Sequence, residues 1–329
     1  MSTLSIQLHL HLFHPITLPL PLQLPLPTPS QLIPNHPHSV TFHPTDVSSF
    51  PSLQAAFKST LATSPQARLD IVIANAGIPG GSLLPICFPP NLAPDQDLPE
   101  PSIKTLEVNV VGAYYTTVLA LHYFGRSGET TETVHAQQLD QPRGAEVQKQ
   151  NLPKQLIFLG SLAAYAIPPT ALTAAYTLSK FSLRGLFKSI RYASLPDAIA
   201  FGLPSIYTQT LPYHLRANMI APSWVETGML GSVGSNTSIS NVMQEAGLAV
   251  ASVRDVVDVV MRVACDREVW GRAVGVVPAG SRSGGDAEGF DLRDDPAGGD
   301  GGKVVWDVVE KTEVFGKGAA EAVGFGAWV

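Results

Sequence analysis

The chain has 329 residues, a formal net charge of −6 and 45% hydrophobic residues, enough for one large α/β domain or two small ones with a sizeable core. Charged residues make up only 15%, and no Lys or Arg precedes Lys58. The composition therefore excludes the basic surface of a nucleic-acid-binding protein. Cys87 and Cys265 lie far apart in the sequence, and we expect free, buried thiols in a reducing compartment.

Residues 1–38 form a segment rich in Pro, Leu and His. Recurrent proline disfavours a helix, and only Ser5–Leu12 alternates polar and apolar residues as a short strand does. The segment lacks the basic start of a secretory signal, and its prolines interrupt the run of about 20 apolar residues that spans a membrane. His9, His11 and His14 have no cysteine or carboxylate nearby to complete a zinc site. We expect a cytoplasmic protein without a membrane partner or metal.

From Ser39 onward, apolar patterns alternate between strand and helix periods. Polar–apolar alternation predicts a strand over Ser39–His43, and apolar residues at helical spacing predict a helix over 51–61. The compact run at 69–74 is typical of a buried parallel strand. Residues 80–101 are rich in proline and are expected to form a loop, and the pattern of residues 103–124 predicts a long helix.

Two polar stretches interrupt the middle of the chain. Residues 125–153 and 195–213 lack periodicity, and we expect both to be insertions. Between them, residues 155–160 predict a buried strand and residues 176–192 a helix. A further strand is predicted over 215–221.

A capped helix and a last strand precede the tail. Apolar residues at helical spacing predict a helix over 252–266, with Ser252 as its cap and Asp255 completing a capping box. Residues 272–278 predict the last clear strand. Residues 281–329 are rich in glycine and are expected to form a loose, partly disordered tail, with one short element around 304–309.

This order of elements predicts a Rossmann-like α/β fold over residues 39–280: a doubly wound parallel sheet with helices on both faces. In such sheets a ligand binds at the carboxyl ends of the strands. Asn75, Ser161 and Pro222 each lie just past a predicted strand, so we expect the functional site there.

Tyr176 and Lys180 lie four residues apart on a predicted helix, which places the phenol and the ammonium on one face. A nearby cation stabilises phenolate and lowers the pKa of the tyrosine from about 10. Such a phenol donates a proton to a carbonyl, or accepts one from an alcohol, while hydride moves at carbon. The alternative is an ordinary pair on an exposed helix.

Two further polar residues favour the catalytic interpretation. Ser161 ends a buried strand directly before that helix, where its hydroxyl is expected to bind a substrate oxygen; the alternative is a turn or cap serine. Asn109 lies in apolar company within a helix. Because buried amides need partners, it is either a structural bracket or a holder of water that leads to Lys180, and both roles are compatible.

Together these residues resemble the short-chain dehydrogenase/reductase family over residues 39–280, weakly its prostaglandin-dehydrogenase-like branch. The matching motifs, in family order, are Thr45-Asp46-Val47, Asn75-Ala76-Gly77, the tetrad Asn109, Ser161, Tyr176 and Lys180, and the segment Ala221–Thr227. The resemblance implies that Tyr176 is the general acid/base, that Lys180 also binds the nicotinamide ribose and that Ser161 positions the substrate carbonyl.

The resemblance also implies a cofactor and an assembly. The implied cofactor is NAD or NADP, with NAD slightly favoured, and the implied contacts are Asp46, Val47, Asn75, Ala76, Gly77, Tyr176, Lys180, Pro222, Val225 and Thr227. Asp46 would contact the adenine ring, and the segment after Pro222 would close over the nicotinamide carboxamide. The helices that hold Asn109 and Tyr176 would form a homodimer or homotetramer.

One departure from the family is large. Glycine is absent before Gly77, so no glycine-rich turn precedes Asp46 to hold the diphosphate, and the sheet is expected to be incomplete at its N-terminal side. Three hypotheses follow: an NAD(P)-dependent enzyme that interconverts a secondary alcohol and a ketone; a non-catalytic relic, or the product of a truncated gene model, that lacks the pyrophosphate site; and a sheet completed by a partner chain.

Overall fold

The structure is a computed structural model of the chain. It describes residues 41–64, 67–126, 153–165, 174–194, 215–227, 229, 232–233, 237–238, 250–278 and 288–294. The expected strand at Ser5–Leu12, the three N-terminal histidines, nearly all of both insertions and the element expected at 304–309 lie outside the described residues.

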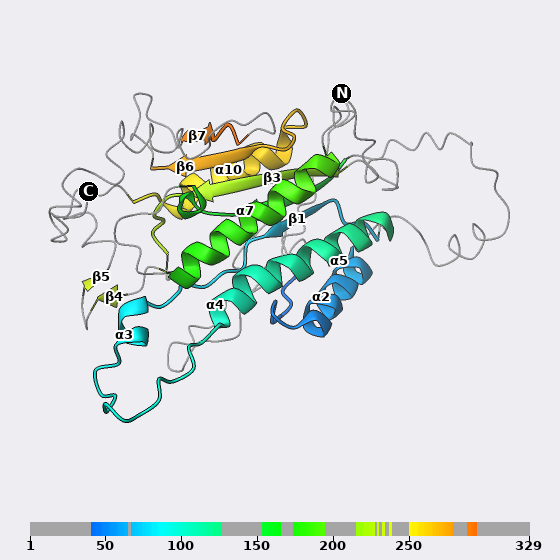
Figure 1. Cartoon of the computed structure of the whole chain (residues 1–329). Helices are drawn as coiled ribbons and strands as arrows, with labels where there is room; N and C mark the ends of the chain where they lie inside the picture. Colours follow the sequence, from blue (N-terminus) through cyan, green and yellow to red (C-terminus); the bar gives the residue numbers. More distant parts are fainter. Residues whose placement is uncertain are drawn as a thin grey trace, which may run out of the picture.

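A five-stranded sheet forms the centre of the molecule (Figure 1). Its strands, in spatial order, are β1 (Ile71–Ala74), β2 (Lys154–Leu159), β3 (Leu215–Pro222), β6 (Ala273–Val277) and β7 (Glu288–Asp291). The first four pair in parallel, and β7 pairs antiparallel with β6. Mixed sheets of this kind are common among doubly wound folds. The structure thus confirms the predicted Rossmann-like α/β fold and the strands predicted at 69–74, 155–160, 215–221 and 272–278.

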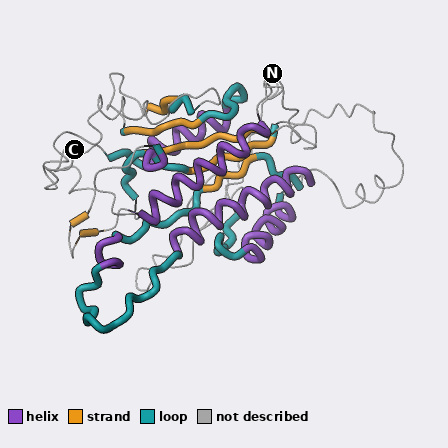
Figure 2. Tube along the Cα trace, in the orientation of Figure 1, coloured by secondary structure: helices purple, strands orange, loops and turns teal. Residues whose placement is uncertain are grey.

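Helices cover both faces of the sheet (Figure 2). On one face lie α2 (Phe50–Thr63), α5 (Gly112–Arg126) and α7 (Ala174–Ser194); α10 (Val253–Cys265) packs on the other, against β3 and β6. Successive side chains of a strand point to opposite faces, and β2 shows this alternation: Leu156 and Phe158 join the core under α5 and α7, whereas Ile157 and Leu159 pack with α10.

Local chemistry explains where these helices begin and end. The Ser252 hydroxyl accepts a hydrogen bond from the Asp255 amide at 3.2 Å, and the Asp255 carboxylate accepts one from the Ser252 amide at 2.7 Å, which confirms the predicted capping box. At the other end of α10, Arg216 of β3 donates to the carbonyls of Ala264, at 3.2 Å, and Asp266. A cation at a helix C-terminus satisfies carbonyls that have no partner within the helix.

Four expectations about local structure were wrong. Thr41–His43 is irregular rather than a strand; proline follows directly, and it cannot donate to a sheet. The loop at 80–101 contains a short helix, α3 (Leu83–Cys87), and the expected loose tail contributes β7. Cys87 and Cys265 are free, as expected, but exposed rather than buried.

None of the helices in the described parts of the chain is long and apolar enough to cross a membrane.

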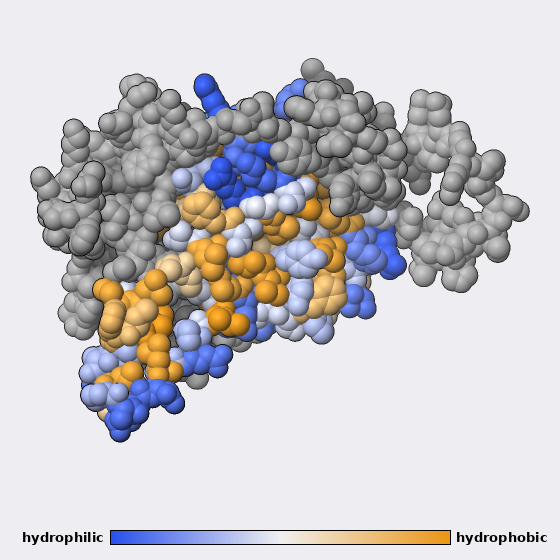
Figure 3. All heavy atoms as spheres, in the orientation of Figure 1, coloured by the Kyte–Doolittle hydropathy of each residue, from blue (hydrophilic) through white to orange (hydrophobic). Residues whose placement is uncertain are grey.

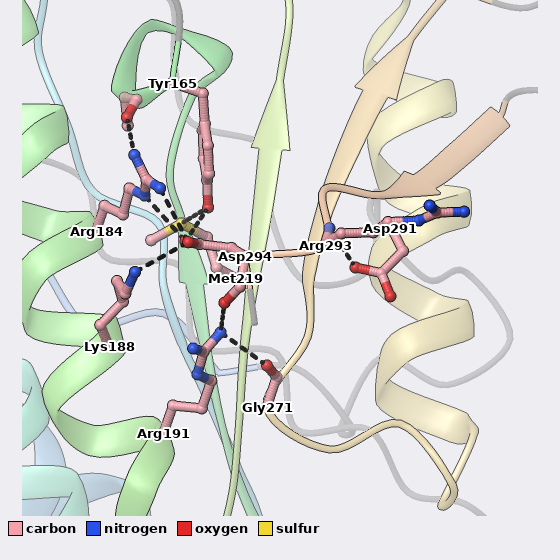
Figure 4. A network of polar contacts seen from close by, with 10 residues as sticks. Tyr165, Arg184, Lys188, Arg191, Met219, Gly271, Asp291, Arg293 and Asp294 are labelled. Atoms are coloured by element: carbon pink, nitrogen blue, oxygen red, sulfur yellow. Dashed lines mark hydrogen bonds and ion pairs between the residues drawn. The ribbon is translucent and has the colours of Figure 1, made fainter. Parts of the chain in front are cut away.

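The carboxylate of Asp294, just past β7, ties the end of the described chain to α7 (Figure 4). Arg184 donates to both carboxylate oxygens at 2.9 Å, and Lys188 donates to one at 3.0 Å. The Asp294 side chain is fully buried. Burial raises the pKa of Asp294, but the hydrogen bonds from Arg184 and Lys188 outweigh it and hold the pKa at about 2.

Asp294→Asn is expected to lower the free energy of unfolding at pH 7 by about 2–3 kcal/mol. The pKa of Asp294 is lower in the folded than in the unfolded chain, so the stabilisation is complete above about pH 5 and is lost as the pH falls toward 2. Urea unfolding at pH 7 and at pH 3 measures both effects. Asp291→Asn, which removes a half-exposed carboxylate paired with Arg272, is the matched control and should cost much less. Equal losses in the two variants would contradict the account.

Candidate active site

The predicted site residues meet at the carboxyl ends of β1, β2 and β3. Asn75-Ala76-Gly77 follows β1, Ser161 follows β2, and Pro222 ends β3. Helix α7 packs against β3 and carries Tyr176 near its beginning and Lys180 one turn later. This is the edge of an open parallel sheet where ligands bind.

Lys180 is buried directly behind Tyr176. Its Nζ donates a hydrogen bond to the Leu159 carbonyl at 3.0 Å and lies 5.5 Å from the centre of the Tyr176 ring. Because burial disfavours the charged ammonium, the pKa of Lys180 is lowered to about 8. The ammonium and the phenol therefore share one face of the helix, as their spacing predicted.

The Ser161 hydroxyl lies near enough to the Tyr176 phenol to influence its pKa. Burial raises the pKa of Tyr176, and the Ser161 hydroxyl partly offsets that rise. The prediction that Lys180 lowers the pKa of this phenol below its ordinary value was wrong for the chain by itself, since the phenol is buried and the ammonium bonds to a carbonyl. Desolvation therefore sets the direction of both shifts: it raises the pKa of Tyr176 and lowers the pKa of Lys180.

Ser161 has a structural role as well. Its Oγ accepts a hydrogen bond from the Ala163 amide at 3.1 Å and so caps the short helix η3 (Leu162–Ala164). It also donates to the Pro222 carbonyl at 3.5 Å. The cap and the site are compatible, because the same bonds hold the hydroxyl beside the Tyr176 phenol.

Asn109 lies in a π-helical turn, η2 (Glu107–Val111), between α4 (Lys104–Leu106) and α5. π-turns inside α-helices are frequent at functional sites. The Asn109 Oδ1 accepts from the Ile78 amide at 2.8 Å, and Nδ2 donates to the Ile78 carbonyl and to the Ser179 hydroxyl, both at 3.0 Å. The structural bracket is confirmed: the amide ties the loop after β1 to α7, beside Lys180. A water relay through Asn109 stays a prediction.

Gly80, which the sequence analysis did not single out, allows the loop after β1 to touch α7. A Cβ at Gly80 would lie 2.7 Å from the Tyr176 backbone nitrogen, whereas a Cβ at Gly81 would meet nothing within 4 Å. Gly80→Ala is expected to push the first turn of α7 aside and to lower kcat about tenfold, because small misplacements of reacting groups are costly. Steady-state kinetics with Gly81→Ala as the control checks this. Parity of the two alanine variants would rule out the contact as a determinant of the site.

The remaining residues expected to contact cofactor have mainly local partners. The Asp46 carboxylate accepts from the Ser48 hydroxyl at 2.6 Å, which lowers the pKa of Asp46. Val47 is buried, with its Cγ2 2.8 Å from where a Gly112 Cβ would lie. Thr227 accepts from a backbone amide two residues later. Contacts in the structure do not bring Asp46 or Thr227 to Tyr176.

Two buried polar atoms fit the nicotinamide end of a dinucleotide. In the described structure, Ser223 Oγ and Trp224 Nε1 are buried without a hydrogen-bond partner, directly after β3. Buried polar groups are normally paired, and a carboxamide supplies both a donor and an acceptor. For the diphosphate end, the described residues ahead of Asp46 contain no glycine, so they offer no backbone cradle of the family kind. The nicotinamide half of the site fits; the other half is not seen in the described chain.

Comparison with known proteins places the chain in a family. No family model matches the sequence. The 5'-hydroxyaverantin dehydrogenase of Dothistroma septosporum is 30% identical to it, over 76% of this chain and 69% of the relative. The 5'-hydroxyaverantin dehydrogenase of Emericella nidulans is also 30% identical, over 86% of this chain and 81% of the relative. The NADP-dependent dehydrogenase M3 of a Phoma species is also 30% identical, over 80% of this chain and 67% of its own length. The chain belongs to the short-chain dehydrogenase/reductase family.

Membership of this family makes the chain an oxidoreductase that uses a nicotinamide cofactor. The relic hypothesis is accordingly not favoured. The sequence predicted Tyr176 and Lys180 from their spacing and the full tetrad from the family resemblance, but gave no prediction for Ser179, Tyr165 or Asp294. Of these three residues, Ser179 could have been found from the sequence, because it directly precedes Lys180. In the structure its hydroxyl accepts a hydrogen bond from Asn109.

Proposed function

We propose that this chain interconverts a small-molecule secondary alcohol and its ketone, with Tyr176 as the proton-transferring group. The observation that carries the proposal is the Lys180 ammonium 5.5 Å from the ring of the buried Tyr176 phenol, with the Ser161 hydroxyl near enough to lower the pKa of that phenol. A general acid/base must lie within hydrogen-bond reach of the group it serves. A substrate oxygen that accepts from both hydroxyls meets that requirement.

The residues divide the work as follows. A bound nicotinamide supplies or accepts the hydride. Ser161 orients the substrate oxygen, and Tyr176 donates its proton to that oxygen in reduction or takes a proton from the alcohol in oxidation. Lys180 keeps a positive charge beside the phenol, which stabilises phenolate as the proton leaves. Asn109 holds the loop after β1 against α7, so these groups keep their separation.

The names of the relatives guide the choice of cofactor and substrate. The Phoma relative is named NADP-dependent, which favours NADP(H) over the NAD preference implied by the family resemblance. Two relatives are named for 5'-hydroxyaverantin, which makes this compound the first alcohol to test. Ser223 and Trp224 are the residues of this chain that we assign to the carboxamide of the cofactor.

The test is nicotinamide absorbance with the full chain, a panel of secondary alcohols and ketones that includes 5'-hydroxyaverantin, and all four forms of NAD(P)(H). We expect turnover with NADP(H). Calorimetry with NAD(H) and NADP(H) supplies a readout that does not depend on the substrate. Binding heat without turnover would show that the proposed substrate class is wrong. No binding heat at millimolar cofactor would overturn the enzyme proposal and favour a non-catalytic relic.

We also propose that the chain forms a homodimer or homotetramer through α5 and α7. Apolar side chains gather on the surface over these helices (Figure 3); the exposed ones are Tyr114, Val118, Leu178 and Phe181, with Val111 at the end of η2 directly before α5. Contiguous apolar surface of this kind marks an interface. Light scattering of the parent and of Val118→Glu tests the proposal: the parent should be an oligomer and the variant a monomer, and a monomeric parent would refute it.

A cytoplasmic location is part of the same proposal. Cys87 and Cys265 are free and exposed, and thiols persist in a reducing compartment. Fluorescent tagging of the full chain tests it, with signal in a membrane-bounded compartment as the contrary result.

A further inference from the structure

We propose that Asp294 is a positioning residue for the reaction above: its carboxylate sets the loop that carries Ser161 against the helix that carries Tyr176 and Lys180. The inference rests on the proposed function. It also assigns a role in the site to the segment after β7, which lies outside every family motif recognised in the sequence.

The carboxylate holds the Ser161 loop through Tyr165, which follows η3 directly. The Tyr165 hydroxyl donates to Asp294 Oδ2 at 3.1 Å, and the Arg184 guanidinium lies 4.1 Å from the centre of the Tyr165 ring. Arg184 also donates to the Ala164 carbonyl at 3.0 Å. The Ala164 amide in turn donates to the Ser161 carbonyl at 3.0 Å. Three hydrogen bonds, through Arg184 and Ala164, therefore connect Asp294 to the backbone of Ser161.

The same carboxylate holds α7. Arg184 binds both of its oxygens as a fork, and Lys188 binds one of them from the next turn (Figure 4). On a helix, residues four apart share a face. Arg184 thus lies one turn after Lys180 and two turns after Tyr176, on the side that faces Ser161.

A third contact backs the loop from the sheet. The Tyr165 hydroxyl lies 3.6 Å from the Met219 sulfur of β3. That sulfur lies 2.9 Å from where a Cβ at Gly160 would stand, so Met219 covers the residue directly before Ser161. Tyr165 is therefore fixed by Asp294 on one side and by the sheet on the other.

Burial makes this arrangement stiff. The Asp294 side chain is fully buried and Arg184 is 19% exposed, which limits the access of water to this pair. Charged, bidentate hydrogen bonds are the most directional that proteins form. Because Ser161 and Tyr176 lie on the two elements that Asp294 joins, their separation depends on this carboxylate.

The experiment compares Asp294→Asn with Asp291→Asn in the full chain. Asparagine keeps the shape of the side chain but removes its charge. We expect Asp294→Asn to lower kcat about 10- to 100-fold with little change in KM, because misplaced groups lose rate rather than binding. Asp291→Asn, which affects an exposed pair with Arg272, should keep the parent kcat. Tyr165→Phe, which removes one hydroxyl, should give a smaller loss than Asp294→Asn.

A double-mutant cycle separates positioning from general destabilisation. If Asp294 acts through Ser161, then Asp294→Asn should cost much less kcat in a Ser161→Ala background than in the parent. Equal costs in both backgrounds, at a temperature where every variant is folded, would overturn the inference.

Hydrogen exchange supplies a readout without activity. In the free protein, the amides of Ala163, Ala164 and Tyr165 should exchange faster in Asp294→Asn, and not in Asp291→Asn. Faster exchange in a chain that shows no turnover would uphold the coupling and refute the proposed function. Unchanged exchange in Asp294→Asn would refute the coupling whatever the activity.

Discussion

Tyr176→Phe is expected to lower kcat by about 10²- to 10⁴-fold, the range that proton transfer by a positioned side chain contributes. The phenol is buried beside Ser161, so phenylalanine keeps the packing and removes only the transferable proton. Cofactor affinity, measured by calorimetry, should stay close to that of the parent, because the lost group acts on the substrate oxygen.

The matched control is Tyr114→Phe on α5, whose side chain is exposed. It should keep the parent rate in the nicotinamide absorbance assay. Turnover by Tyr176→Phe at the rate of Tyr114→Phe would remove Tyr176 from the mechanism. A loss of folding in Tyr176→Phe, visible by circular dichroism, is not expected, since only the hydroxyl is removed.

Lys180→Met is expected to abolish most turnover and, at the same time, to stabilise the fold. The pKa of Lys180 falls from 10.5 to about 8 on folding, so below pH 8 the folded chain bears the cost of a buried charge, about 3 kcal/mol. Methionine removes that cost but leaves the Leu159 carbonyl without its donor, a loss of about 1 kcal/mol. The net gain is about 2 kcal/mol at pH 7.

The pH dependence gives this prediction its sign. Stability of the parent should rise between pH 8 and 10.5, as the folded ammonium loses its proton first, and Lys180→Met should lack that rise. Urea unfolding across this range measures it. Lys154→Met is the control: Lys154 is equally buried but pairs with Asp70 at 2.8 Å, at the opposite end of β2 from Ser161, so its loss should leave turnover intact. Destabilisation by Lys180→Met would contradict the account.

Features with a local signature could be predicted from the sequence. The buried runs before Asn75 and Ser161 marked two strands and so the edge where the site lies. The spacing of Tyr176 and Lys180 placed both on one helix face, and the Ser252–Asp255 pair marked the beginning of α10. Each of these depends on residues a few positions apart.

Features that depend on distant partners could not be predicted. Arg184 and Asp294 are separated by 110 residues, and nothing near either one indicates the other. Strand β7 carries a single large apolar residue, Phe290, which covers Gly275 of β6. No alternating pattern therefore predicted this strand. The raised pKa of Tyr176 likewise depends on burial, which the helix spacing does not contain.

The most direct test of the central claim is isotope transfer. The full chain is incubated with a ketone and NADPH, or NADH, that carries deuterium at the transferable position, and the alcohol is examined by mass spectrometry. We predict that the parent and Tyr114→Phe form alcohol with one deuterium on the carbinol carbon, and that Tyr176→Phe forms almost no labelled alcohol in the same time. Unlabelled alcohol, or equal amounts of labelled alcohol from the parent and Tyr176→Phe, would contradict hydride transfer at a site built from Ser161, Tyr176 and Lys180.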